Sequence, residues 1–474
     1  MANTSTTDVL VIGAGPGGYT AAFLAADLGL NVTLVDPEEN PGGVCLYRGC
    51  IPTKVLLHVV KVRMEATAAS EWGITFTAPE IDLQKINAWK DNVVKKLTGG
   101  LGQLVKQRKI TYIQGKARFV DSQTVEITND QDDPQTVGFT NAIIATGSEA
   151  LRLPNIDLQS PRLLDPAAAL RLKDIPERLL VIGAGYIGLE MSSIYLGLDA
   201  KVTIVEMMPD LMPDADQDII AAFKKRNAQR FEAVMVNTKV AAIEEVNQGL
   251  QVRFDGEDLE KEEDTFDKVL YAIGRQPLTD DLGLENTQVE TNDQGFITVD
   301  LQRKTTDNAI YAIGDVTGPP LLAHKASHEG RVAAEAIAGH KTAFEPNVIP
   351  AVEYTDPEVA WCGLTENQAK EEGRQVEVAK FPWAASGRAA TLGRSDGLTK
   401  LLIDPDTERI LGAGIVGPDA GKLISEAALA IEMAAVAKDL ALTIHPHPTL
   451  SETLMEAAEA FYGTCTHIYR PKKQ

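Results

Sequence analysis

The chain has 474 residues, with 45 lysines and arginines against 67 acidic residues, so its formal net charge is −22. Such an acidic balance argues against a general nucleic-acid or anionic-membrane binder, because both partners are polyanions. Hydrophobic residues make up 44% and charged residues 24%, which excludes a globally disordered chain. At roughly 100–200 residues per domain, we expect about two to four domains.

The N-terminal segment gives no targeting signal. No lysine or arginine precedes Arg48, whereas a secretory signal needs a basic start and a transit peptide is rich in arginine, so we expect a cytoplasmic protein. Val9–Ala26 contains no charge and is long enough to suggest a membrane span. The glycines in its middle predict a strand, a turn and a helix instead.

The first predicted unit covers Asp8–Asp36 and has the pattern strand, glycine turn, helix, strand. Its turn reads Gly13-x-Gly15-x-x-Gly18, and such glycines let a backbone approach a pyrophosphate at a helix N-terminus. Asp36 ends the second strand and is placed to bind ribose hydroxyls. The alternative is a tight strand–helix turn that binds no ligand.

A cysteine pair follows in the segment GGVCLYRGCIPTK, Gly42–Lys54. Pro52 fits the first turn of a helix, so we expect Cys50 at the helix N-terminus, where the dipole favours a thiolate. A disulfide between Cys45 and Cys50 would close a short loop and add little stability, which favours a redox role. The alternatives are two buried free cysteines or half of a zinc site, for which Cys362 and Cys465 do not supply suitably spaced ligands.

The middle of the chain alternates short strands and turns. Three apolar runs end in a small residue and a glycine, which lets a ligand approach the backbone: Ile143–Ser148, Leu270–Arg275 and Ile310–Asp315. Two alternating segments predict antiparallel hairpins: Gly115–Thr128 and Gly249–Glu260. We expect the acidic run Asp255–Asp264 to be a solvated hairpin tip and Ser160–Glu177 to be a linker.

The second predicted unit, Arg178–Glu206, repeats the pattern of the first. Its turn reads Gly183-x-Gly185-x-x-Gly188, and the acid again lies 23 residues after the first glycine (183 to 206). An acid at this place accepts hydrogen bonds from a free ribose 2′-hydroxyl and repels a 2′-phosphate, which favours NAD over NADP. Two such units predict two dinucleotides, most simply FAD and NAD.

The C-terminal part, from about Asn347, has the pattern of a separate α+β domain, with an amphipathic helix at Lys422–Ala441. Near its end, His445 and His447 alternate with prolines, and we expect a helix to begin near Thr449. A histidine can exchange protons near neutral pH, as thiol chemistry requires; the alternative is a histidine pair packed under proline rings. Glu452 either orients an imidazole or completes a capping box with Thr449, and the two interpretations are equally supported.

The order of these motifs along nearly the whole chain resembles the pyridine nucleotide–disulfide oxidoreductase family, class I, and within it the dihydrolipoyl dehydrogenases. The resemblance implies an α/β fold with two Rossmann-like dinucleotide-binding domains and a C-terminal α+β dimerisation domain. The boundaries that we expect are 1–150 for the first part of the FAD domain with the redox disulfide, 151–276 for the NAD domain, 277–346 for a segment completing the FAD domain, and 347–474 for the interface domain.

The resemblance also assigns site residues. It implies that Cys45 exchanges with substrate, that Cys50 faces the flavin, and that His447 is the acid–base, oriented by Glu452. Lys54 is expected near the flavin, paired with Glu190. The FAD set that it implies is Gly13, Gly15, Gly18, Asp36, Lys54, Ala117, Gly147, Asp315 and Ala323. The NAD set that it implies is Gly185, Gly188, Glu206, Val240 and Gly274. The expected cofactor-binding residues further include Gly43, Thr146, Gly183 and Arg275, and no metal is expected.

The activity implied by the resemblance is oxidation of protein-bound dihydrolipoamide by NAD, in 2-oxoacid dehydrogenase complexes or the glycine cleavage system. The expected partners are a second copy of the chain, whose His447 and Glu452 complete the active site, and the lipoyl and subunit-binding domains of an acyltransferase core. No nucleic acid and no membrane is expected. Tyr47 departs from the asparagine that many members carry. The acidic surface either steers docking of a basic domain or reflects adaptation to salt.

Competing interpretations share parts of this pattern. A glutathione or trypanothione reductase would prefer NADP, which Glu206 opposes. A mercuric reductase would carry an adjacent cysteine pair near its C-terminus, and a soluble transhydrogenase would lack one redox cysteine. A non-catalytic FAD-binding subunit or redox sensor would have no reason to retain both cysteines together with His447 and Glu452.

Overall fold

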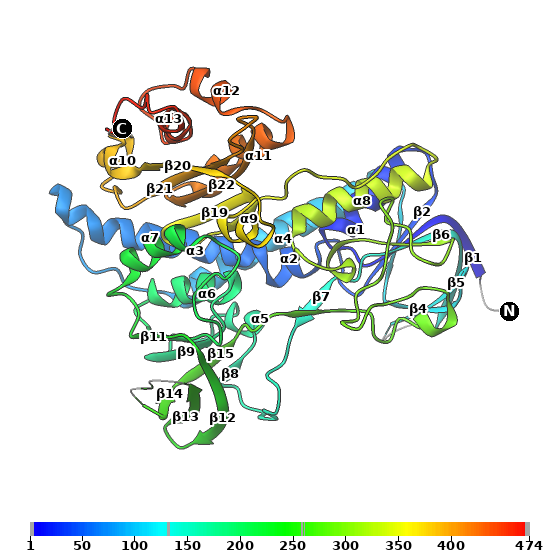
Figure 1. The fold of residues 1–474 in the computed structure, drawn as a ribbon. Coiled ribbons are helices and arrows are strands. Elements are labelled where there is room, and N and C mark those ends of the chain that lie inside the picture. The colour runs from blue at the N-terminus through cyan, green and yellow to red at the C-terminus, as the bar shows by residue number, and fades with distance from the viewer. Residues whose placement is uncertain (1–3, 130–132, 257–258, 260, 470–474) are drawn as a thin grey trace.

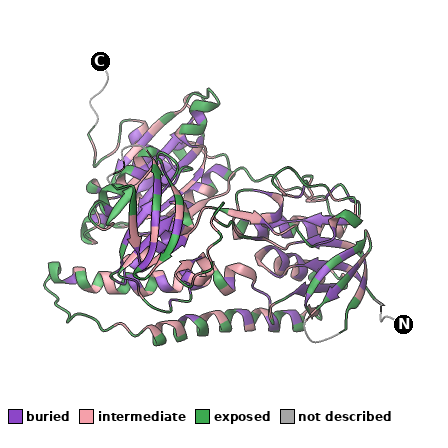
Figure 2. Cartoon of the chain, turned by 90° about the horizontal axis from the view of Figure 1, so that it is seen from below, coloured by how far each residue is buried: buried purple, intermediate pink, exposed green. Residues whose placement is uncertain are grey.

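The computed structural model describes residues 4–129, 133–256, 259 and 261–469. Three lobes are visible in Figure 1: one contains the N-terminal strands, one lies below α6, and one carries the C-terminal strands and helices. Strands in the middle of the sheets are mostly buried, whereas the outer helices have a buried and an exposed side (Figure 2).

The first lobe is built on a sheet with the order β3-β2-β1-β6-β5-β4, in which β17 also pairs with β6. β1, β2, β3, β6 and β17 pair in parallel, and β4 and β5 are antiparallel. Their bounds are β1 (Thr4–Ile12), β2 (Val32–Asp36), β3 (Thr111–Gln114), β4 (Lys116–Asp121), β5 (Thr124–Thr128), β6 (Gln135–Ile144) and β17 (Ile310–Ala312). β2 is buried throughout, as expected of a parallel strand covered on both faces.

Helices cover this sheet and connect it to the rest of the chain. They are α1 (Pro16–Asp27), α2 (Gly43–Arg48), α3 (Cys50–Ala68), α4 (Leu83–Gln107) and α8 (Ala323–Ile337). α1 and α8 pack against each other, and α3 packs against α4 and α6. The helical stretch Gly43–Trp72 is long and apolar enough to cross a membrane by composition alone, a test that core helices of globular proteins also pass.

The second lobe repeats the strand–helix–strand unit in a parallel sheet with the order β11-β10-β9-β15-β8. Its strands are β8 (Leu163–Leu164), β9 (Arg178–Ile182), β10 (Lys201–Val205), β11 (Ala233–Met235) and β15 (Lys268–Tyr271), and its helices are α5 (Pro166–Ala169), α6 (Tyr186–Leu196) and α7 (Gln217–Asn227). Ser160–Glu177 is more than the predicted linker, because it supplies β8 and α5 and buries Leu170 and Leu172 in the core.

Two small antiparallel sheets accompany these lobes. β12 (Thr238–Val246), β13 (Gly249–Gly256) and β14 (Glu263–Phe266) form one, and β7 (Ser148–Ala150) pairs with β16 (Arg275–Pro277) in the other. The predicted hairpin at Gly115–Thr128 is confirmed as β4 and β5. The second predicted hairpin was only partly right: β13 is the central strand of three, and residues 257, 258 and 260 lie outside the described part.

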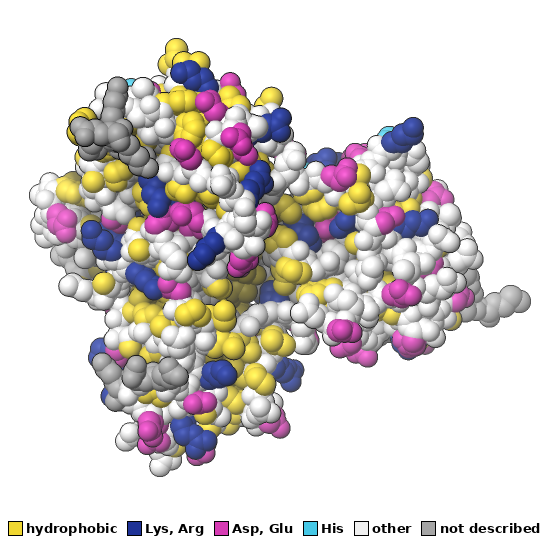
Figure 3. All heavy atoms as spheres, viewed as in Figure 1, with side chains coloured by type: hydrophobic (Ala, Val, Ile, Leu, Met, Phe, Trp, Pro, Cys, Tyr) yellow, Lys and Arg dark blue, Asp and Glu magenta, His cyan; other side chains and the backbone are white. Residues whose placement is uncertain are grey.

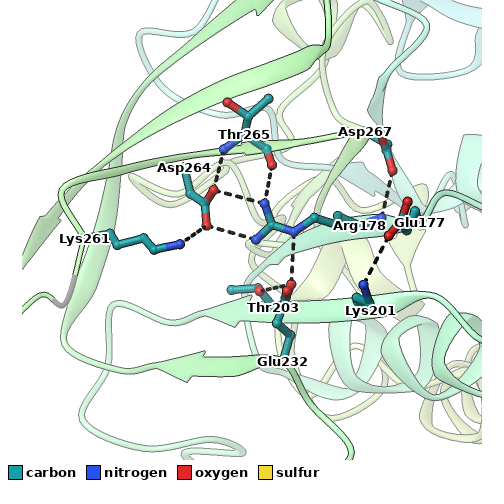
Figure 4. Close-up of polar contacts among 9 residues, drawn as sticks. All are labelled: Glu177, Arg178, Lys201, Thr203, Glu232, Lys261, Asp264, Thr265 and Asp267. Carbon is teal, nitrogen blue, oxygen red and sulfur yellow. Dashed lines mark hydrogen bonds and ion pairs between the residues drawn. The ribbon is translucent and has the colours of Figure 1, made fainter.

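The acidic run that follows β13 is not simply a solvated tip. Figure 4 shows Arg178 at the start of β9 between Asp264, Thr265 and Glu232. Its Nη1 and Nη2 donate to the Asp264 oxygens at 3.0 and 2.9 Å, and Nη1 also donates to the Thr265 carbonyl at 2.7 Å. The Arg178 guanidinium holds the pKa of Asp264 well below its usual range. The described end of the run therefore anchors β14 to β9.

The third lobe is an antiparallel sheet with the order β18-β19-β22-β21-β20. Its elements are β18 (Ala351–Glu353), β19 (Glu358–Gly363), β20 (Glu377–Pro382), β21 (Leu398–Ile403), β22 (Ile410–Gly417), α9 (Glu366–Glu371), α10 (Gly387–Thr391), α11 (Ala420–Glu432), α12 (Ala437–Leu442) and α13 (Glu452–Phe461).

Two expectations about this lobe were wrong in detail. The single helix expected at Lys422–Ala441 is divided, because the backbone at Ala435 and Ala437 bonds to the strand region: Ile410 N donates to Ala435 O at 3.1 Å, and Ala437 N to Glu408 O at 2.8 Å. The last helix begins at Glu452 rather than near Thr449.

Candidate active site and nucleotide sites

The two glycine loops have the same geometry. A Cβ on Gly18 would lie 1.8 Å from the Gly13 carbonyl oxygen, and a Cβ on Gly188 would lie 2.0 Å from that of Gly183, so both helices approach their strands too closely for any side chain. The middle glycines have more space: nothing lies within 4 Å of a Cβ on Gly185, and a Cβ on Gly15 would lie 3.9 Å from the Gly43 Cα. The start of the second helix is thus open to a ligand, and that of the first is bordered by Gly43; a pyrophosphate needs such a close approach to the backbone.

The acids at the ends of β2 and β10 hold these loops in the same way. Asp36 accepts hydrogen bonds from the Ala14 amide at 2.6 Å and the Glu38 amide at 2.9 Å. Glu206 accepts from the Ala184 amide at 2.7 Å and from the amide two residues beyond itself at 2.8 Å. Burial raises the pKa of Asp36, although both amides oppose this. Each carboxylate oxygen has a second lone pair for a ribose hydroxyl.

The cysteine pair lies directly against the first loop. Gly42 N donates to the Ala14 carbonyl at 2.8 Å, and a Cβ on Gly43 would lie 2.5 Å from the Gly15 Cα. Cys45 belongs to α2, and Cys50 is the first residue of α3, which confirms its predicted place at a helix N-terminus.

Both cysteines are free thiols and are hydrogen-bonded to each other. The hydrogen bond from Cys45, helped by the charge of Lys54, lowers the pKa of Cys50 to about 7, although burial opposes the shift. The same contact and burial raise the pKa of Cys45. Cys50 is therefore the thiol of the pair that carries the negative charge when both cysteines are reduced.

Lys54 and Glu190 form the expected pair across 136 residues of sequence: Lys54 Nζ lies 2.7 and 2.9 Å from the two carboxylate oxygens. Glu190 is 4% exposed. Tyr354, which sequence reasoning missed, completes this group. Its amide donates to Glu190 Oε1 at 3.1 Å, and its ring lies 4.5 Å from Lys54 Nζ. Its position, directly after β18, carries no sequence motif.

The remaining residues of the expected FAD set line the ends of neighbouring strands. Thr146 donates through its hydroxyl to the Leu278 carbonyl at 2.7 Å, and Gly147 accepts from the Leu278 amide at 2.9 Å. Ala117 is buried in β4. Ala323 is the first residue of α8, whose N-terminal part packs on the start of α1.

Asp315 accepts a hydrogen bond from the Ser148 hydroxyl. Arg275, expected among the cofactor residues, donates to Ser148 Oγ at 2.7 Å and lies 4.0 Å from Asp315. A cavity of ≈ 570 Å³ adjoins this group and is lined by Val44, Arg48, Ser148 and Arg275, among others. Of the expected NAD set, Gly274 bonds to the Leu151 amide through its carbonyl, and Val240 lies in β12 beside a bulge.

The two histidines differ sharply in their surroundings. The His445 side chain is 3% exposed, and its Nε2 and Nδ1 contact Glu426 Oε1 at 2.7 Å and the Thr443 carbonyl at 2.8 Å. The His447 side chain is 74% exposed, and its Nδ1 contacts Glu452 Oε1 at 2.8 Å. His447 Nε2 has no hydrogen-bond partner among the described residues, so this nitrogen is available to a substrate.

The capping box expected between Thr449 and Glu452 does not form, because the helix begins at Glu452 with Ser451 as its N-cap and without a side-chain cap hydrogen bond. The contact with the imidazole is present in Glu452. Its Oε1 contacts His447, and its Oε2 accepts from the Thr449 amide at 2.7 Å. Burial would raise the pKa of Glu452, but these two donors hold it below its ordinary value.

The described contacts of this chain do not join the histidine pair to the cysteines. The first glycine loop, by contrast, contacts Gly42 and Gly43 of the cysteine segment, and Glu190 lies in α6, the helix that follows the second loop.

The other two cysteines lie elsewhere. Burial raises the pKa of Cys362 to about 12. Cys465 donates to Glu456 Oε2 at 2.6 Å, and burial together with this contact raises its pKa to about 11. Both are therefore weakly acidic thiols.

The sequence matches known proteins over nearly its full length. Residues 7–330 match the family model described as pyridine nucleotide-disulphide oxidoreductase, and residues 349–458 match the dimerisation domain of that family. The chain is 48% identical over 472 residues to a dihydrolipoyl dehydrogenase of Haemophilus influenzae, covering 100% of this chain and 98% of the relative. It is 47% identical to one of Thermus scotoductus, covering 98% and 99%.

Solved structures give the same result. The crystal structure of LpdA from Mycobacterium tuberculosis superposes with a TM-score of 0.89 at 25% identity, covering 96% of this chain and 99% of that one. The Cu(II) complex of the HOCl-induced flavoprotein disulfide reductase RclA from Escherichia coli superposes with a TM-score of 0.86 at 27% identity, with the same coverage.

Proposed function

Because the chain belongs to the pyridine nucleotide-disulphide oxidoreductase family, we propose that it acts as a dihydrolipoyl dehydrogenase, which oxidises a protein-bound dihydrolipoyl group with NAD. Its cofactors are FAD and NAD. Relatives of this name at 44–48% identity over nearly the whole chain support the proposal. The observation that carries it is the Cys45–Cys50 pair beside the Lys54–Glu190 pair, with the pKa of Cys50 lowered to about 7.

Thiol–disulfide exchange supplies the first half of the reaction. His447 of the partner subunit takes a proton from one substrate thiol through Nε2, while Glu452 holds its Nδ1. In the oxidised enzyme, the resulting thiolate attacks Cys45 of the Cys45–Cys50 disulfide, the bond between the two cysteines breaks, and a mixed disulfide forms with Cys45. The second substrate thiol then displaces Cys45 and closes the substrate disulfide, and its proton passes to the Cys45 sulfur. Cys45 is left as a thiol, Cys50 as a thiolate and the partner's His447 protonated, with the substrate's two electrons on the cysteine pair.

The second half depends on how the chain holds its cofactors. The chemistry that FAD would supply when bound beside Cys50 is two-electron transfer from the reduced cysteine pair to NAD. The first glycine loop and Asp36 would hold the adenine half of FAD, and Ser148, Asp315 and Ala323 lie where they would support the rest. Lys54 stabilises negative charge beside Cys50. The second loop and Glu206 would bind NAD and disfavour a 2′-phosphate.

The domain boundaries proposed from the sequence fit these assignments, with residues 1–150 and 277–346 forming the FAD domain, 151–276 the NAD domain, and 347–474 the interface domain. The dimerisation-domain match supports a homodimer. Figure 3 shows hydrophobic side chains at the surface of the C-terminal lobe. Met433, Leu442 and Ile444 are 73%, 68% and 94% exposed there, and a second copy would bury them.

The docking partner that we propose is the acyltransferase core of a 2-oxoacid dehydrogenase complex, through its lipoyl and subunit-binding domains, in the cytoplasm. The net charge of −22 supports attraction to a basic domain. The affinity of the enzyme for the subunit-binding domain, measured at increasing ionic strength, tests this attraction. An affinity that does not fall as salt is added would contradict the charge-based argument.

A substrate assay decides the activity. We expect turnover with dihydrolipoamide and NAD to exceed turnover with glutathione disulfide and NADPH, and the reverse preference would refute the proposal. A spectrum tests the inner thiol: the reduced enzyme should show a long-wavelength thiolate–flavin band that Cys50→Ser abolishes, and retention of that band would overturn the assignment.

A further inference from the structure

Glu353 is a buried acid that the mechanism above does not use. It ends β18, is 3% exposed, and its Oε2 is fully buried without a hydrogen-bond partner among the described residues. An ionised carboxylate in such a place, with no cation bound to it, is strongly unfavourable. The group avoids this cost by keeping its proton.

The charges around Glu353 reinforce this conclusion. Burial raises its pKa well above the ordinary value, and the charges of Glu190 from α6 and Asp214 from the segment before α7 raise it further. Lys54 from α3 is already bound to Glu190. Among the described residues of β19 and α11, which also pack on β18, none contributes a charge that acts on Glu353.

The backbone connects Glu353 directly to the redox site. The next peptide amide, that of Tyr354, donates to Glu190 Oε1 at 3.1 Å. The Tyr354 ring lies 4.5 Å from Lys54 Nζ, and the charges of Lys54 and Glu190 both act on Cys50. Glu353 is therefore the residue next to Tyr354, whose amide and ring contact the Glu190 and Lys54 pair that acts on Cys50.

We propose that Glu353 is a positioning residue of the redox site: it stays protonated during turnover, so that no second negative charge acts on Glu190, the acid that binds Lys54. If Glu353 lost its proton, a second negative charge would repel the Glu190 carboxylate that binds Lys54 and would oppose the addition of electrons to a flavin held beside the pair. The inference deepens the proposed function and rests on it only for the substrate that delivers the electrons.

The test compares the holoenzyme with Glu353→Gln, since glutamine has the shape of the neutral acid but cannot ionise. We expect the variant to keep wild-type turnover within about twofold at neutral pH, because the charge is unchanged. As the pH rises above neutrality, the wild-type flavin spectrum should shift with one ionisation that the variant lacks, and wild-type turnover should fall through that ionisation.

Glu358→Gln is the matched control. Glu358 lies on the adjacent strand β19, and burial raises its pKa too, but it accepts the Gly421 amide at 3.0 Å. This control should retain the wild-type ionisation. If Glu353→Gln also retains it, or loses more than about tenfold in turnover at neutral pH while folded with FAD, the proposal is overturned.

Infrared spectroscopy of the oxidised holoenzyme reports the proton directly and needs no substrate. At neutral pH, the difference spectrum between the wild type and Glu353→Gln should contain one protonated-carboxyl band, as should that with Glu353→Ala if the glutamine variant does not fold. A difference spectrum without that band overturns the inference. Because this readout is independent of dihydrolipoamide, it separates an error here from an error in the proposed activity.

Discussion

Lys400 offers a stringent test of how the second and third lobes are held together. Its side chain is 0% exposed, and Nζ lies 2.7 Å from Asp216 Oδ2 and 2.9 Å from Asp218 Oδ1, with Glu366 as a third partner. Asp216 and Asp218 belong to the start of α7, and Lys400 belongs to β21. The ammonium therefore joins α7 of the second lobe to the C-terminal sheet, beside the Lys380–Asp218 pair.

Lys400→Met removes the cation but keeps an apolar side chain of similar length. Breaking a buried ion pair from one side costs about 3–5 kcal/mol, because the remaining charge is left uncompensated. Lys380 still binds Asp218 at 2.6 Å, so we expect the lower end of the range, about 3 kcal/mol. At about 2–4 °C per kcal/mol, the unfolding midpoint should fall by roughly 6–12 °C.

Lys422→Met is the control. Its pair with Asp419 has a similar length, 2.8 Å, but the side chains are 83% and 40% exposed, and exposed pairs contribute about 0–1 kcal/mol. Thermal unfolding of the two holoenzyme variants is followed by circular dichroism. It compares the loss of a buried lysine–aspartate pair with the loss of an exposed one, with the same substitution at both sites. The deficit of Lys400→Met should also grow with pH, since its buried acids can take up protons only when the pH is low. Equal midpoints for the two variants would falsify the argument.

Three further predictions concern the reaction. His447→Gln should lower dithiol oxidation strongly and leave FAD bound, whereas His445→Gln, whose imidazole nitrogens are both occupied, should affect mainly stability; steady-state assays and flavin content distinguish them, and near-normal turnover of His447→Gln would contradict the assignment. Glu452→Ala should lower kcat and also destabilise the start of α13, since its carboxylate binds both the imidazole and a backbone amide. In the reduced enzyme, alkylation of Cys50 should follow a midpoint near its pKa of about 7, and Lys54→Met should move that midpoint to higher pH; an unmoved midpoint would exclude the charge effect of Lys54.

The features that could be predicted from the sequence depend on local geometry. The glycine loops can be predicted from three closely spaced glycines. The place of Cys50 at a helix N-terminus can be predicted from Pro52, which fits the first turn of that helix. Glu452 fitted two patterns equally well, and the structure shows the contact with His447 but no capping box, since the helix begins at Glu452 itself. The resemblance supplied the Lys54–Glu190 pair, which no local pattern could have joined across 136 residues.

The features that could not be predicted depend on tertiary contacts. The break between α11 and α12 has no glycine or proline to mark it; it arises because backbone groups at Ala435 and Ala437 bond to residues near β22. Tyr354 and Glu353 gain their importance from packing against α6, and Arg275 from reaching Ser148 in another sheet. In a sequence pattern, a buried glutamate in a short strand cannot be told from an exposed one.

The dual bonding of Glu206 has a consequence for cofactor engineering. The usual route from NAD to NADP replaces the acid by a residue that tolerates a phosphate, but here the same carboxylate is the acceptor for the amides of Ala184 and Met208. A substitution chosen only for the ribose would leave two loop amides without their acceptor. A change of coenzyme in this scaffold therefore has to redesign the loop and the acid together, and the same constraint holds for Asp36 at the flavin loop.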